Sequence, residues 1–95
     1  MPEFLVELYV SQADGASIRR GAERARSAAD ELRNQGTFVR YVRSIFVPDD
    51  ETCFQLYRAS SVAAVRELGS RAGLRFERVS EAAAAPGERN TRKDP

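Results

Sequence analysis

The chain has 95 residues, and at this length folding buries roughly 60–65% of the unfolded surface, enough for one domain with a modest core. Its 15 Lys and Arg residues are nearly cancelled by 14 Asp and Glu residues, so it lacks the excess positive charge that attracts nucleic acid or an anionic membrane. With one cysteine, Cys53, and neither a leader-like nor a membrane-length apolar run, we expect a cytoplasmic protein without a disulfide and without nucleic acid or membrane partners.

The beginning of the chain predicts a strand followed by a helix. Glu3–Val10 alternates apolar and mixed positions with the period of two that a half-buried strand shows. After a turn, Asp14 or Ser17 can cap a helix, and Gly36 ends it as the first residue beyond its last turn. The buried stripe of this helix is predicted from apolar positions three and four apart: Ile18, Ala22, Ala25, Ala29 and Leu32.

The middle of the chain, Thr37–Arg58, predicts a β-hairpin. The runs 37–42 and 52–57 are both rich in β-branched and aromatic residues, which favour strands. Pro48, Asp49 and Asp50 lie between them and are typical turn residues. This hairpin is the centre of the predicted fold.

A second helix and a last strand follow the hairpin. Ser60 or Ser61 can cap the helix and Gly73 ends it, with a buried stripe predicted from Val62, Val65, Leu68 and Ala72. Leu74–Ser80 predicts the last strand, with a register that a bulge can shift. Residues 82–95 have little apolar surface to bury and are predicted to be a disordered tail.

The two halves of the chain resemble each other, which indicates the fold class. Glu7-Leu8-Tyr9 recurs as Gln55-Leu56-Tyr57, and each half reads strand, helix, strand. The order βαββαβ with internal duplication predicts an α+β, ferredoxin-like sandwich over residues 1–81. In this fold a four-stranded antiparallel sheet carries both helices on one face.

The alternation along the strands predicts which side chains face the helices: Phe4, Val6, Leu8, Val10, Phe54 and Leu56. The other face would then carry Glu7, Tyr9, Cys53, Gln55 and Tyr57. Because such a partly apolar sheet face is uncovered within its own chain, we expect a homodimer of the dimeric α/β-barrel type, with a cavity between two sheets.

The residue types limit the chemistry that this cavity can hold. The chain has no histidine, which removes the commonest general base and metal ligand, and its glycines do not form a phosphate-binding motif. The candidate ligand-binding residues are those expected to line the cavity: Glu7, Tyr9, Tyr41, Arg43, Cys53, Gln55 and Tyr57. Alternatively, Glu7 pairs with Arg43, the tyrosines pack a dimer interface, and Cys53 is a small buried hydrophobe.

Several short motifs, in their order and spacing, resemble a known family: Met1–Glu7, Thr52–Ala59, Val65–Glu67 and Arg71–Leu74. The chain is similar over Met1 to about Val79 to small nickel-binding proteins of actinobacteria, a family of otherwise unknown function. The resemblance implies a ferredoxin-like homodimer and nickel as a possible cofactor, with Glu7 matching a family glutamate as a candidate metal ligand. Family members tend to have a histidine where this chain has Arg43, which cannot ligate a divalent metal, so we expect nickel to bind weakly or not at all.

Two classes of function follow from these observations. The first is a homodimeric binding protein that holds a metal or a small polar ligand between its sheets. The second is a cofactor-independent enzyme, similar to the small monooxygenases and polyketide cyclases that share the dimeric α/β-barrel architecture. The two differ in whether the cavity converts a substrate or only retains a ligand.

Overall fold

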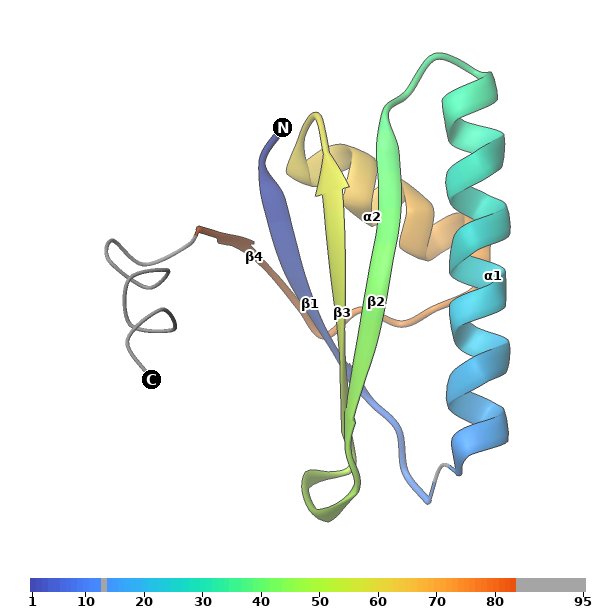
Figure 1. Ribbon diagram of the computed structural model, residues 1–95, viewed down its shortest axis with the longest axis vertical. Coiled ribbons are helices and arrows are strands. Elements are labelled where there is room, and N and C mark those ends of the chain that lie inside the picture. Colours follow the sequence, from blue (N-terminus) through green and yellow to red (C-terminus); the bar gives the residue numbers. More distant parts are fainter. Residues whose placement is uncertain (13, 84–95) are drawn as a thin grey trace, which may run out of the picture.

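The computed structural model describes residues 1–12 and 14–83 of the chain. Its elements follow the order β1 (Glu3–Tyr9), α1 (Gly15–Asn34), β2 (Val39–Val47), the short 3₁₀ turn η1 (Pro48–Asp50), β3 (Thr52–Ala59), α2 (Val62–Ala72) and β4 (Arg78–Ala82), as Figure 1 shows. The predicted βαββαβ order and α+β class are confirmed. Of the predicted tail, Ala82 is the last residue of β4, and 84–95 lie outside the described residues.

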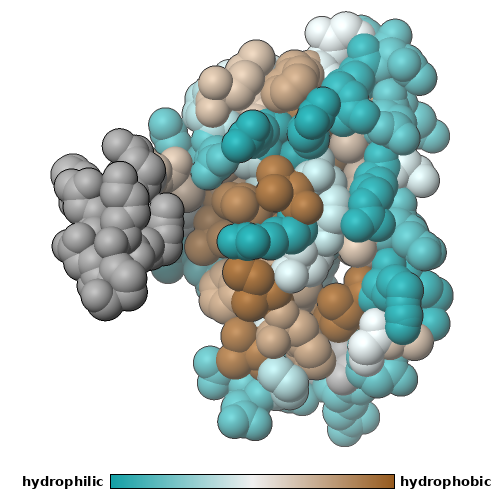
Figure 2. Space-filling view, in the orientation of Figure 1, coloured by the Kyte–Doolittle hydropathy of each residue, from teal (hydrophilic) through white to brown (hydrophobic). Residues whose placement is uncertain are grey.

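The four strands form one antiparallel sheet in the order β2-β3-β1-β4, the strand order of a ferredoxin-like sandwich. In Figure 1, α2 lies behind the sheet and α1 runs beside the edge strand β2. The sheet face turned toward the viewer in Figures 1 and 2 carries no helix of the described part of the chain. We call it the open face.

The helix ends form as local chemistry dictates. Asp14 caps α1 by accepting a 2.9 Å hydrogen bond from the Ser17 backbone N–H, and Ser61 caps α2 by accepting one from Ala64 at 3.1 Å. Gly36 and Gly73 follow the two helices with φ of 92° and 70°, a left-handed backbone that glycine adopts without a Cβ penalty. The sequence predicted both glycines, and the structure selects Asp14 over Ser17 and Ser61 over Ser60 as the caps.

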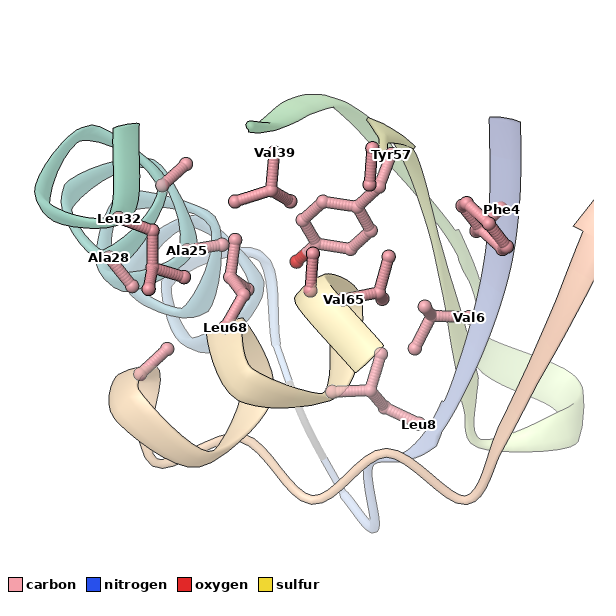
Figure 3. Packing of buried hydrophobic residues seen from close by; sticks show 14 of the residues in the cluster. Phe4, Val6, Leu8, Ala25, Ala28, Leu32, Val39, Tyr57, Val65 and Leu68 are labelled. Atoms are coloured by element: carbon pink, nitrogen blue, oxygen red, sulfur yellow. The ribbon is translucent and has the colours of Figure 1, made fainter. Parts of the chain in front are cut away.

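The core lies between the helices and the opposite face of the sheet. Figure 3 shows the Tyr57 ring pointing from β3 toward the helices, among Ala25, Val39, Val65 and Leu68. Phe4, Val6 and Leu8 of β1 continue this layer and are at most 6% exposed. Four alanines of α1 are nearly fully buried, and their small side chains let the helix approach β2 and α2 closely: Ala22, Ala25, Ala28 and Ala29.

The predicted assignment of β3 side chains to the two faces was wrong. The β1–β3 register places Phe4 opposite Tyr57, Val6 opposite Gln55 and Leu8 opposite Cys53. Directly opposed residues share a face, so Cys53, Gln55 and Tyr57 point toward the helices while Phe54 and Leu56 lie on the open face. A shift of one residue exchanges the two sets completely.

The prediction for the last strand also needs correction. It runs over Arg78–Ala82 rather than Leu74–Ser80, and pairs only with β1. Leu74 and Phe76, which suggested a strand, instead pack on the core from the segment before β4. The Phe76 ring lies 6.0 Å from that of Tyr57, so these apolar residues cover the layer between helices and sheet.

Candidate functional site

The open face is the candidate functional site, because it combines apolar and charged side chains without cover from the described chain. Tyr9, Val42 and Ile45 are 59%, 40% and 48% exposed. In Figure 2, hydrophobic residues gather at the middle of this face, and hydrophilic side chains cross them. From the register and alternation of the three strands β1, β2 and β3, the apolar members are Leu5, Val42, Ile45, Val47, Phe54 and Leu56.

Glu7 and Arg43 both lie on this face, but on different strands. Glu7 is opposite Phe54 of β3, and Arg43 is opposite Leu56 of the same strand. With β3 between them and a two-residue offset, their backbones are about 12 Å apart at ~4.8 Å per strand and ~3.4 Å per residue. The ion pairs of residues 1–12 and 14–83 include neither residue, so the predicted Glu7–Arg43 pair does not form within one chain.

The third predicted residue on the open face is Tyr9, at the end of β1. Its hydroxyl donates a 2.9 Å hydrogen bond to Glu51 Oε1, and the second oxygen of Glu51 accepts from the Gln12 backbone N–H at 3.1 Å. Glu51 adopts a left-handed backbone with φ 49° at the end of the β2–β3 turn. Tyr9 therefore joins β1 to this turn and leaves most of its ring exposed.

The remaining four predicted ligand residues belong to the helix-facing side. Tyr57 donates a 2.5 Å hydrogen bond to Gln55 Oε1, and Tyr41 shares a 2.7 Å hydrogen bond with Ser44. Burial raises the pKa of the Tyr57 phenol far above its usual value, and Tyr41 and Cys53 add to the shift. Burial also raises the pKa of the Cys53 thiol, despite a hydrogen bond with Ser44 that lowers it, so the thiol stays protonated and unreactive at neutral pH.

A β-bulge explains why Tyr41 and Arg43 lie on different faces. Residues two apart on a regular strand share a face, which is why the sequence predicted these two together. The β2–β3 register shifts between Tyr41 and Arg43, leaving Val42 as an extra residue. The seven predicted residues thus divide into Glu7, Tyr9 and Arg43 on the open face and the four others in or beside the core.

The sequence interpretation missed the apolar centre of the open face. Phe54 and Leu56 had been assigned to the helix-facing side of the sheet. Arg78, which lies opposite Glu7 on β4, had not been considered because the predicted last strand had another register. The sequence allowed two registers between β1 and β3. The apolar residues of β1 oppose either Cys53, Gln55 and Tyr57 or the residues next to them, and this choice decides which side chains of β3 lie on the open face.

No three His, Cys, Asp or Glu side chains within residues 1–12 and 14–83 come together in an arrangement suited to a metal ion. No helix in this part of the chain is both long and apolar enough to cross a membrane.

These observations define a class: a small α+β sandwich with a ferredoxin-like fold, in which one sheet face carries no helix of the described residues. A family model described as nickel responsive protein SCO4226-like matches residues 4–82, and the chain belongs to this family. The fold is similar to the crystal structure of SCO4226 from Streptomyces coelicolor A3(2), with a TM-score of 0.76 and 14% identity over 87% of this chain and 98% of that one. No curated protein matches the chain.

Proposed function

We propose that this protein is a homodimeric binding protein that packs two open faces together and holds a small polar ligand between them. The single observation that supports this most is the uncovered apolar centre of the open face in so small a domain. A sheet face with large exposed apolar side chains usually marks an interaction site. A second copy of the chain is the proposed partner, because the charges on this face complement one another.

The charge arrangement supports a two-fold dimer. Glu7 and Arg43 lie on either side of β3, and the midpoint between them falls between Phe54 and Leu56. A two-fold axis over this midpoint can bring Glu7 of one protomer opposite Arg43 of its partner, twice per dimer. The same axis brings together the apolar centres. Arg43, which takes part in no ion pair among residues 1–12 and 14–83, would then lie opposite a carboxylate of the other protomer.

The ligand proposed for the cavity is a polar organic molecule rather than nickel. Nickel is the metal named in the family description, but the residues of this chain do not fit it. The sequence contains no histidine, and the thiol of Cys53 is buried on the helix side of the sheet. Among the described residues, Glu7 belongs to no group of side chains that could hold a metal ion, and no imidazole is present to bind nickel. Glu7, Tyr9 and Arg43 instead offer a carboxylate, a phenol and a guanidinium to hydrogen-bonding groups.

A matched pair of substitutions tests the dimer. Ile45 on the open face and Val62 on α2 are 48% and 46% exposed, so replacing either by lysine costs a monomer about the same. We expect sedimentation equilibrium at micromolar concentration to show a dimer for the wild type and Val62→Lys, and a monomer for Ile45→Lys. Native mass spectrometry of the same samples would show a ligand retained by the dimers as added mass. A monomeric wild type, or a dimer unaffected by Ile45→Lys, would contradict the proposal.

Nickel binding is expected to be weak or absent, for the lack of imidazole and accessible thiolate donors. Calorimetric titration of Ni²⁺ into the protein measures this, with tag-free protein because a polyhistidine tag binds the metal itself. Glu7→Ala serves as the control, since Glu7 is the candidate metal ligand. A stoichiometric sub-micromolar site that disappears in Glu7→Ala would restore the metal function.

A further inference from the structure

A second concave site lies away from the open face, between α1 and the edge strand β2. It is a pocket of about 250 Å³, and its polar wall consists of Arg26, Asp30 and Arg33 from α1 and Arg40 and Tyr41 from β2. The helix residues are spaced by three, four and seven positions, so they lie on one face of α1. Three arginine residues therefore line one small concavity, two from the helix and one from the edge strand.

Two of these arginines are held by contacts that orient them. Arg33 donates a 2.7 Å hydrogen bond to the Val39 carbonyl and pairs with Asp30. The Arg26 guanidinium lies over the Tyr41 ring, 5.0 Å from its centroid, in a cation–π contact. Tyr41 is fixed in turn by its hydrogen bond with Ser44 and its edge contact with Tyr57. The wall of the pocket is thus built on the core.

The pocket carries more positive charge than its own residues neutralise. Three arginines face one carboxylate, Asp30, which leaves two positive charges. Arg26 and Arg40 take no part in the ion pairs or side-chain hydrogen bonds found among residues 1–12 and 14–83. By contrast, Arg71 in the groove between the helices pairs with Glu31 and Glu67.

We propose that this pocket binds the phosphoryl group of a small phosphate monoester. A guanidinium offers a planar fork of donors that matches the oxygens of a phosphoryl group, and two free forks match a dianion in charge. The volume equals about eight water molecules at ~30 Å³ each, which suffices for the phosphoryl group and a small substituent. Inorganic phosphate presents the same chemistry without the substituent. The site requires neither the dimer nor a metal.

NMR titration of ¹⁵N-labelled protein at constant ionic strength tests the site, with phenyl phosphate and inorganic phosphate as the probes. We expect saturable shifts at Arg26, Asp30, Arg40 and Tyr41 with both probes, and tighter binding of phenyl phosphate if the substituent also contacts the pocket. Arg26→Gln and Arg40→Gln should each weaken binding at least about tenfold, since each removes a charge-assisted hydrogen bond. Both arginines are exposed, so these variants are expected to fold, which circular dichroism checks.

Arg66→Gln is the matched control, because Arg66 is an exposed arginine on α2, outside the pocket. It should leave the affinity unchanged. The proposal is overturned if no saturable shift appears at tens of millimolar phosphate, if Arg66→Gln weakens binding as much as Arg40→Gln, or if acetate, a monoanion, binds as tightly as phosphate. Because Ile45→Lys leaves this pocket intact, the monomeric variant should bind phosphate normally whether or not the proposed dimer exists.

Discussion

Replacing Tyr57 by alanine is expected to lower the free energy of unfolding by about 3–5 kcal/mol. Tyr57 is fully buried, contacts the rings of Tyr41 and Phe76, and its hydroxyl is the hydrogen-bond donor to the buried Gln55. The substitution leaves a large cavity and removes the partner of a buried amide. For a small domain this is a large part of the total stability. Urea unfolding followed by circular dichroism measures the change, best in the Ile45→Lys background so that dimer dissociation does not contribute.

Two controls separate the ring from the hydroxyl and from surface effects. Tyr57→Phe keeps the ring and removes the donor to Gln55, so we expect a smaller loss of about 1–3 kcal/mol. Tyr9→Ala makes the same substitution at a tyrosine that is 59% exposed, and should cost below about 1 kcal/mol. Equal losses for Tyr57→Ala and Tyr9→Ala would mean that Tyr57 does not belong to the core.

Arg43→Ala is expected to weaken the proposed dimer by about 2–3 kcal/mol, because it would remove the guanidinium opposite Glu7 of the partner and leave that carboxylate with only Arg78 of its own chain nearby. The dimer dissociation constant, measured by sedimentation over a dilution series, gives the effect. The double variant Glu7→Ala, Arg43→Ala removes both charges. Its loss of dimerisation free energy should therefore be smaller than the sum of the losses in the two single variants. This non-additivity is the signature of a pair across the interface.

Other outcomes assign Arg43 differently. If the single losses simply add, the two residues do not interact. If Arg43→Ala dimerises with unchanged affinity but no longer retains a ligand in native mass spectrometry, Arg43 serves the ligand rather than the interface. A variant with both wild-type dimerisation and wild-type ligand retention would exclude both roles.

Much of the fold could be predicted from the sequence because its signals are local. Asp14, Gly36, Ser61 and Gly73 act within one helical turn, and the apolar stripes repeat every three to four residues. The order of strands and helices then permits few topologies. The prediction of the last strand was wrong because Leu74 and Phe76 pack against the core from a segment that is not a strand. A pattern of apolar residues does not distinguish such packing from pairing in a sheet.

The candidate site was harder to predict because a shift of one residue in the register between β1 and β3 exchanges the side chains of the two sheet faces. Along β3, the set Cys53, Gln55 and Tyr57 and the set Phe54 and Leu56 both look able to face a core, and hydropathy favours the second. The structure buries the first set. The Tyr57 hydroxyl donates a hydrogen bond to the side chain of Gln55, two residues away on the same face, so both polar groups are paired in the core. Such mutual satisfaction of polar groups is a tertiary property. It cannot be read from the alternation of apolar residues along one strand.

The extra residue at Val42 divides β2 into two parts whose alternating side chains face different sides of the sheet. Before it, Val39 and Tyr41 face the core and the arginine pocket; after it, Arg43 and Ile45 face the open side of the sheet. A regular strand would tie these positions together, because a change of register at one end turns the other end over as well. Here the bulge uncouples them. New recognition properties can therefore evolve, or be engineered, at Arg43 and Ile45 while the other half of the same strand keeps its packing.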